Sequence, residues 1–528
     1  MRARRFARNL IVIPTLAVLG ALAPDAAAQE PTGMTLVGEQ DSLRVYQIDE
    51  IVVQRTRANR PASPVAFTNV THEEIQEVSY GQDVPMVLAA TPSTYAYSDA
   101  ANGFGYTYLK IRGFDQNRLG MLVNGVPLND PEAHQVYWVD HGDVLSGAQS
   151  IQVQRGVGTP LFGATSFGGG VNVITSPLAI DPGLHLELGY GDYTEKGLDL
   201  PVRTYRASFA SGPIDDGSSA LYARYSRLNS EGYREASAAD QESFGLSGLH
   251  AGGFGNHKID LLVGRERTQF AWDGISPQYG FDLDDLDERR HNPYAVYENN
   301  VDDFTQVVGS ITSEIPIRSD LAITNTAYYV DGDGFFEQFK EDRDFYDYGF
   351  ESILMPDSTI VEETDLVQRR WLRNHYWGLL PQIEIPLAGG TGTFGAGLRR
   401  YEAAHYGEIV WTDVDVLAGP LDRYYSYDTE KTSFEGYGQI QVPVLERTIL
   451  TAALQYQGHR YDYRQARIGN FKGYEFEVDH DFVNPRLGIK HNLSPRIDFY
   501  GSVGYAQREP SDSDYLDGDD PGAVPAFA

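Results

Sequence analysis

The motifs of this chain that could do chemistry are few, and each departs from the pattern its chemistry requires. The glycine-rich stretch from Gly156 to Gly163 lacks the Lys-Ser/Thr ending of a phosphate loop, and no helical pattern follows it. The run from Asp331 to Gly334 loses the calcium-loop spacing after Asp333, which favours an acidic surface loop. The 12 histidines contain no HExxH pair, and there is no cysteine. The sequence therefore predicts no catalytic residue, no metal site and no cofactor, and we do not expect an enzyme.

Two polar loops have a composition suited to binding. They are Pro92 to Tyr106 and Pro127 to Trp138, in which aromatic residues alternate with Gly, Asn and Asp. Aromatic rings can stack on a ligand while the polar groups hydrogen-bond to it. His134 could touch a ligand or a metal, although a solvated loop histidine is the favoured interpretation.

Composition limits the possible partners and the compartment. The formal net charge of −32 disfavours nucleic acid as a partner, because phosphate backbones are also negative. Residues 1–28 combine a basic start, an apolar core and a small-residue cleavage site, which predicts a secretory signal peptide. The absence of cysteine suits export into an oxidising periplasm. After residue 23 there is no long apolar run, which excludes a helical membrane protein but not a membrane barrel.

The elements that would position the two loops lie around them in the first third of the chain. Short runs rich in Val and Ile, closed by Gly, Asn or Pro, predict four strands in one small sheet. They are centred on Ile111, Met121–Val123, Ile151–Val153 and Val171–Ile174. Thr71 followed by Glu at the third position predicts a helix start, and residues 82–90 predict a second helix.

From about residue 183 onward, the sequence contains segments of roughly ten residues in which apolar and polar residues alternate. Leu454 and Tyr456 are expected on one face and Gln455 and Gln457 on the other. About thirteen segments are predicted, near residues 184, 203, 220, 244, 257, 304, 320, 375, 393, 432, 448, 482 and 496. Short connections alternate with long ones, predicted at about 265–303, 331–374, 403–431 and 459–481. This alternation favours an outer-membrane barrel over a soluble sandwich or a propeller.

Four segments in one order, IRGFDQNR, VNGVPLND, IQVQRGVG and FGGGVNVIT, resemble the plug domain of TonB-dependent outer-membrane receptors. The flanking DAANGFGYT and VYWVD runs are most similar to the Bacteroidetes-type branch of that family. The resemblance implies a transmembrane β-barrel with an N-terminal α+β plug in its lumen. It divides the chain into a signal peptide (1–28), a flexible coupling segment (29–60), the plug (61–180) and a partial barrel (181–528).

The resemblance also implies partners and site residues. Residues 48–54 look like a TonB box, and the residues expected to pair with the TonB protein are Asp49, Glu50, Ile51, Val52 and Val53. The two aromatic loops would form the plug apex, where the receptor contacts a small ligand. By resemblance, that ligand is an iron chelate. The expected ligand contacts are Tyr95, Tyr97, Asp99, Asn102, Phe104, Tyr106, His134, Tyr137 and Trp138. Outer-membrane lipid would surround the barrel.

A barrel wide enough to hold a plug takes about 22 strands, so the sequence is expected to be a truncated form of its parent. The predicted function of that parent is TonB-dependent import of a ferric siderophore across the outer membrane. Haem, cobalamin or a glycan are the alternative ligands, and a passive porin or surface adhesin is the alternative of another class.

Overall fold

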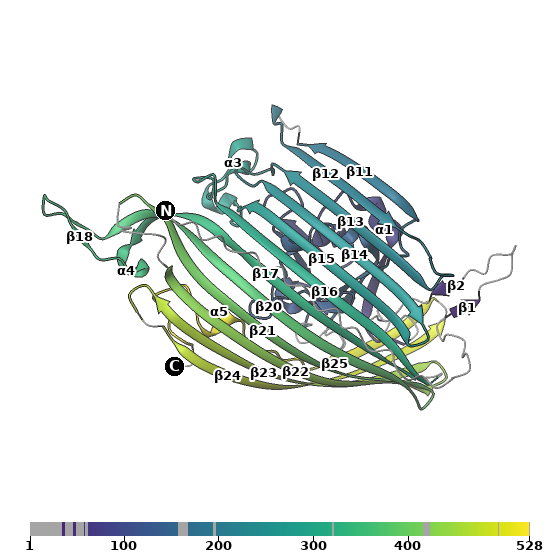
Figure 1. Ribbon diagram of the computed structural model, residues 1–528. Coiled ribbons are helices and arrows are strands. Elements are labelled where there is room, and N and C mark those ends of the chain that lie inside the picture. Colours follow the sequence, from purple (N-terminus) through teal and green to yellow (C-terminus); the bar gives the residue numbers. More distant parts are fainter. Residues whose placement is uncertain are drawn as a thin grey trace, which may run out of the picture.

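The computed structural model places a small mixed α/β domain against the concave face of one large curved sheet (Figure 1). It describes residues 34–36, 46–48, 58, 62–156, 167–193, 197–318, 321–414, 423–471, 473–494 and 496–526. The predicted signal peptide and the predicted TonB-pairing residues 49–53 lie outside these ranges. Among the described residues, no helix is long and apolar enough to cross a bilayer.

The small domain, which we call the plug, contains two sheets rather than the single sheet that the sequence predicts. A two-stranded pair, β1 (Met34–Leu36) and β2 (Tyr46–Ile48), precedes it. The larger sheet has the order β3-β9-β10-β7-β8, with β3 (Ala66–Thr71), β7 (Leu119–Val123), β8 (Val126–Pro127), β9 (Ala148–Arg155) and β10 (Gly169–Thr175). The segment at Ile111 forms a separate sheet, β4-β5-β6, from β4 (Thr94–Ser98), β5 (Thr107–Ile111) and β6 (Phe114–Asp115).

Both predicted plug helices are present, and short 3-10 turns link the strands. The Thr71 side chain accepts a hydrogen bond from the Glu74 amide at 3.3 Å, and the Glu74 carboxylate accepts one from the Thr71 amide at 2.8 Å. This capping box starts the first helix where the sequence predicts it. The helices are α1 (His72–Val78) and α2 (Val84–Leu88), and the 3-10 turns are η2 (Gln116–Arg118), η3 (Trp138–His141) and η4 (Val144–Gly147).

The large sheet is an antiparallel meander of thirteen strands in sequence order, one at each predicted segment. They are β11 (Gly183–Asp192), β12 (Pro201–Ala210), β13 (Ser219–Ser230), β14 (Ala239–Gly252), β15 (Gly255–Gln269), β16 (Val301–Arg318), β17 (Leu321–Asp344), β20 (Glu363–Leu387), β21 (Gly390–Thr412), β22 (Arg423–Leu445), β23 (Thr448–Ile468), β24 (Glu475–Ser494) and β25 (Ile497–Gly504). Its edge strands β11 and β25 do not pair with each other among the described residues, so the barrel is not closed.

The sheet is polar inside and apolar outside, which is the reverse of a water-soluble protein. On β23, Leu454 and Tyr456 are 55% and 42% exposed, whereas Gln455 and Gln457 are fully buried. The predicted alternation is therefore confirmed, with the apolar residues on the convex face. Such a surface matches lipid outside and a hydrated, plug-filled lumen inside.

Most strands are longer than predicted, and all four predicted long connections are shorter. Strands β16, β17 and β20 to β24 have 18 to 25 residues, and Asp331 to Gly334 lies within β17 instead of in a surface loop. Above the apolar band the outward residues become charged and form cross-strand ion pairs such as Arg373–Asp333 at 2.8 Å. The alternation of apolar and polar residues ends there, although the ladder of backbone hydrogen bonds continues. The sequence pattern therefore predicts loops for these halves of the strands.

The remaining elements lie in the long connections at one end of the barrel. They are η7 (Pro277–Tyr279), α3 (Leu286–Arg290), α4 (Phe345–Tyr348), β18 (Ile353–Leu354) and β19 (Ile360–Val361). The β18–β19 hairpin projects away from the barrel mouth (Figure 1). After β25, residues 505–526 with α5 (Asp512–Tyr515) fold back into the lumen, where the Glu509 carboxylate lies 2.5 Å from the Lys431 ammonium of β22.

The backbone of the plug approaches the wall closely at Gly264 of β15. A Cβ atom built on Gly264 would lie 1.9 Å from the main-chain carbonyl oxygen of Asp140 in η3. Real Cβ atoms do not approach a backbone oxygen so closely, so the contact depends on glycine.

We expect Gly264→Ala to destabilise the plug–barrel unit by about 1–3 kcal/mol, because the added methyl group pushes η3 off the wall. Urea unfolding of the purified protein in detergent micelles measures the change. Gly309→Ala on β16 is the matched control, since no atom lies within 4 Å of a Cβ at that position. Equal stability of the two variants would contradict the close packing inferred at Gly264.

Candidate functional site

The two aromatic loops lie on the side of the plug that faces the long connections. In the first loop, the carbonyl oxygen of Ala100 accepts a hydrogen bond from the Tyr233 amide at 3.2 Å. Tyr233 belongs to the connection between β13 and β14. The plug end that carries these loops is therefore the apex, at the mouth formed by the long connections.

Tyrosines of the β4–β5 sheet form the more accessible part of the apex. Tyr95 is 62% exposed and Tyr97 stacks on Tyr108 with ring centroids 4.8 Å apart. The Lys110 ammonium lies 6.0 Å from the centre of the Tyr97 ring and pairs with Asp115 at 2.7 Å. This patch combines stacking surfaces, hydroxyls and one cation, which suits a ligand with flat faces and anionic oxygens.

The other predicted contacts of the first loop are mostly turned toward protein. Phe104 is 1% exposed and packs edge-on against Tyr80 at 5.7 Å. Asn102 donates to the Ser230 hydroxyl of β13 at 3.0 Å, and the Tyr106 hydroxyl donates to the Asp302 carboxylate of β16. The Asp99 carboxylate accepts a hydrogen bond from Tyr108 at 3.0 Å. These residues fasten the apex to the plug core and the barrel wall.

The second loop divides in the same way. Tyr137 is 43% exposed, whereas Trp138 lies in the plug core and donates to Gln116 at 3.3 Å. His134 is buried, with its Nε2 atom 3.4 Å from the Pro510 carbonyl oxygen. Burial, with nearby Lys431 adding to it, lowers the pKa of His134 to about 3, so the ring is neutral at physiological pH. Among the described residues, no three His, Asp or Glu side chains gather as metal ligands.

Glu132 is a functional residue that sequence reasoning missed. Its carboxylate accepts hydrogen bonds from Tyr401 at 2.7 Å and Tyr461 at 3.1 Å, and lies 3.0 Å from the His405 ring nitrogen. Burial alone would raise the pKa of Glu132, but His405 and the hydroxyl donors lower it to about 2. The ionised side chain thus attaches the second loop to strands β21 and β23. A single acidic residue in a turn gives no sequence signal for this role.

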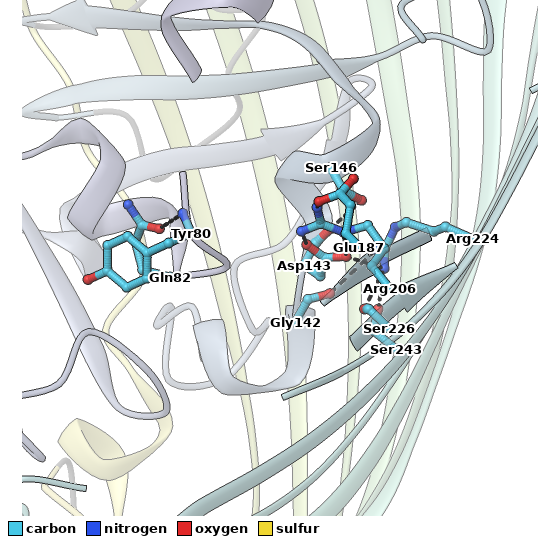
Figure 2. A network of polar contacts seen from close by, with 10 residues as sticks. All are labelled: Tyr80, Gln82, Gly142, Asp143, Ser146, Glu187, Arg206, Arg224, Ser226 and Ser243. Atoms are coloured by element: carbon cyan, nitrogen blue, oxygen red, sulfur yellow. Dashed lines mark hydrogen bonds and ion pairs between the residues drawn. The ribbon is translucent and has the colours of Figure 1, made fainter. Parts of the chain in front are cut away.

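Asp143, at the start of η4, attaches the plug to strands β12 and β13 of the wall (Figure 2). Its carboxylate accepts from the Arg206 Nε at 2.8 Å and lies 3.4 Å from an Arg224 amino group. Arg224 is buried on β13 and also donates to the Ser243 hydroxyl at 2.9 Å. Burial raises the pKa of Asp143, but Arg224 and Arg206 more than offset it and hold it below its ordinary value. Figure 2 shows these groups converging with Glu187, whose carboxylate lies 2.5 Å from Arg206.

A cavity of about 180 Å³ lies beside this ion pair, between the plug and strands β11 to β14. Its lining includes Tyr80, Gly142, Leu188, Tyr205 and Gln241. It is smaller than a typical pocket for a whole ligand, which is several hundred Å³. The exposed tyrosine patch is therefore the better candidate for ligand contact.

At a third attachment, through the Tyr106–Asp302 hydrogen bond, acidic side chains of the plug and the wall gather. Asp140 of η3 is buried close to Asp302 of β16, and Asp302 in turn binds Tyr106. Burial, with Asp302 and Asp130 adding repulsion, raises the pKa of Asp140 well above its ordinary value. Like charges brought together in a dry site favour the protonated form. This contact therefore differs from the Asp143 contact, which is held by opposite charges.

Family models match both parts of this architecture. Residues 60–170 match the TonB-dependent receptor plug domain, and residues 215–527 match the TonB-dependent receptor-like β-barrel. The chain belongs to the TonB-dependent receptors. The plug and barrel that the sequence predicts are thereby confirmed for this receptor.

Solved receptors share the fold at low sequence identity. The ferric-catecholate import receptor Fiu of E. coli K12 superposes with a TM-score of 0.63 at 14% identity, over 86% of this chain and 71% of that one. The ferric citrate transporter FecA superposes with a TM-score of 0.65 at 15% identity, over 84% of this chain and 63% of that one.

Among curated proteins, the vitamin B12 transporter BtuB of Vibrio vulnificus is 27% identical over 183 residues, which are 34% of this chain and 29% of that protein. The ferrioxamine B receptor of Salmonella typhimurium is 25% identical over 156 residues, 29% of this chain and 20% of that protein. The match thus spans less than a third of these curated relatives.

We expect Asp143→Asn to destabilise the receptor by about 3–5 kcal/mol, because it leaves the buried Arg224 without its anion. Asparagine tolerates the left-handed backbone of this position, where φ is 56°, so the charge is the main change. Urea unfolding in micelles gives the difference. Asp216→Asn, at an exposed left-handed position with φ of 57°, is the control and should change stability little. A loss below 1 kcal/mol at Asp143 would show that the ion pair is not an anchor.

Burial of Asp140 near Asp302 predicts that the stability of the protein falls as pH rises. This is the reverse of the dependence expected for Asp143, whose pKa is lowered. The pKa of Asp140 is raised in the folded protein, so its stabilising proton is fully present below the unfolded pKa of about 3.9 and is lost as pH rises. Asp140→Asn should therefore gain thermal stability relative to the wild type as pH increases from about 5 to 9. The exposed Asp181→Asn is the control. A difference in unfolding temperature that stays constant with pH would contradict this interpretation.

Proposed function

We propose that the complete receptor imports a ferric siderophore across the outer membrane of a Gram-negative-type cell by TonB-dependent transport. The observation that carries this proposal is a plug of the TonB-dependent family lodged in the polar lumen of a lipid-facing sheet. Two of the structural neighbours carry ferric ligands in their names, a ferric-catecholate receptor and a ferric citrate transporter. A passive porin would not need a plug fastened to three parts of its wall.

In this proposal the ligand meets the exposed apex tyrosines first. Tyr95 and Tyr137 are exposed at the apex, and Tyr97 is half-buried beside Tyr95. The loops that carry these tyrosines are held in place by Asn102, Phe104 and Trp138. These three residues therefore support ligand binding without contacting the ligand. The receptor has no predicted nucleotide site, so the energy for import would come from the inner membrane through TonB.

The TonB protein would pair with residues Asp49, Glu50, Ile51, Val52 and Val53 by adding a strand. This segment follows directly after β2, which ends at Ile48. A chain segment next to a short strand pair and ahead of the plug is well placed to transmit force to the plug. Acidic residues followed by β-branched ones favour an extended conformation for that pairing.

Cobalamin is the second candidate ligand, because one relative is a vitamin B12 transporter with 27% identity over 183 residues. Uptake of radiolabelled ferrioxamine B, ferric citrate and vitamin B12 by cells that express the full-length gene would decide between the two. Each probe is measured with and without TonB. Uptake that persists without TonB would support the porin alternative, and fractionation without detergent would reveal a soluble protein.

We expect Val52→Pro to abolish TonB-dependent uptake while ligand binding to whole cells persists, because proline removes a strand hydrogen-bond donor. Ser42→Pro in the same flank is the control and should leave uptake intact. Both activities are measured with the radiolabelled probe that the wild type imports. Normal uptake by the Val52 variant would refute the assignment of the TonB segment.

A further inference from the structure

One arginine links two of the connections next to the apex to each other and to the apex. Arg234 lies in the connection 231–238 between β13 and β14 and is 6% exposed. Its guanidinium donates to the main-chain carbonyl oxygens of Ala271 at 2.6 Å, His291 at 2.7 Å and Asp99 at 3.3 Å. Ala271 and His291 lie in the long connection 270–300 between β15 and β16, and Asp99 begins the apex loop. One side chain therefore joins three segments that are far apart in the sequence.

The same three segments meet in further contacts around Arg234. Asn292 donates to the carbonyl oxygens of Phe270 at 2.7 Å and Glu235 at 2.8 Å, which ties the two connections together. Trp272 packs on Tyr106 of the apex loop with ring centroids 5.8 Å apart. Connection 270–300 thus packs directly on the apex through the Trp272–Tyr106 contact, and it is linked to the apex a second time through Arg234.

The geometry of the arginine fork explains why this residue type is needed. Its acceptors lie in different directions, and a planar guanidinium with five N–H donors can reach them together. A lysine ammonium on a flexible stem would satisfy only part of the set. Among the described residues, Arg234 forms no ion pair with a carboxylate, and hydrogen bonds to main-chain carbonyl groups supply its attachment.

We propose that Arg234 is a positioning residue that couples connection 270–300 to the apex loop 99–106, so that these segments open and close as one unit. This inference rests on the proposed import function for its biological meaning, since a ligand held by the connection would then act directly on the plug. The coupling itself is a property of the receptor without ligand. It can therefore be tested without knowing the ligand.

The test is hydrogen–deuterium exchange of the full-length receptor in detergent micelles, wild type against Arg234→Lys and Arg234→Ala. We expect exchange in peptides from 99–106 and from 270–300 to rise together by about tenfold or more, the alanine variant exceeding the lysine variant. Peptides from β9 in the plug core should stay protected, which shows that the variants fold. Arg227→Lys, an exposed residue paired with Asp240 on the outer face of β13, is the matched control.

An increase confined to connection 270–300 would mean that Arg234 only orders its own neighbourhood, and it would overturn the proposal. An unchanged pattern in both segments would overturn it as well. Because exchange is measured without ligand or TonB, these outcomes are independent of the uptake assays. A receptor that fails to import siderophores could still show the coupling, and the reverse also holds.

Discussion

A strand in a lipid bilayer has no water to satisfy its backbone, and this constraint organises the rest of the molecule. Each of the thirteen strands must pair with its neighbours, which leaves the side chains to alternate between lipid and lumen. The lumen face is therefore polar, as at Gln455 and Gln457. A plug inside such a wall makes only limited apolar contact with it, mainly around Val126. Hydrogen bonds, ion pairs and close backbone contact therefore contribute much of its attachment.

The three attachments solve this problem with different chemistry. Asp143 between two arginines is stable while all partners are ionised, and Glu132 relies on tyrosine hydroxyls and a histidine ring. The acid group at Asp140 is most favourable when protonated. The plug is thus attached at β12–β13, β15–β16 and β21–β23 by contacts that respond differently to charge. A movement that releases one of them does not require the others to break at once.

The sequence predicts the parts of this fold that repeat a local pattern. Alternation at Leu454, Gln455 and Tyr456 marks a lipid-facing strand, and Thr71 with Glu74 marks a helix start. Strand ends are not predicted, because beyond the bilayer the outward face also carries charges, as at Asp331 and Asp333, and the apolar–polar alternation is lost. The attachment residues are not predicted either. Glu132 meets Tyr401 across 269 residues of sequence, and only the folded chain brings them together.

The candidate site shows the same limit. Aromatic loop composition locates the apex, but it does not separate Tyr95, which is exposed, from Phe104, which is buried. Both have the same local context of small and polar residues. Which ring faces outward depends on where β13 and the connection 270–300 lie against the loop, and that is a property of the tertiary structure.

Arg234 binds main-chain carbonyl groups, which every residue type presents. Apart from Trp272 and Asn292, the side chains of connection 270–300 can therefore change through evolution without loss of its attachment to the plug. A receptor built in this way can acquire a new ligand preference at its mouth while it keeps the route by which the mouth communicates with the interior. Within this one connection, ligand preference and attachment to the plug can therefore depend on different groups.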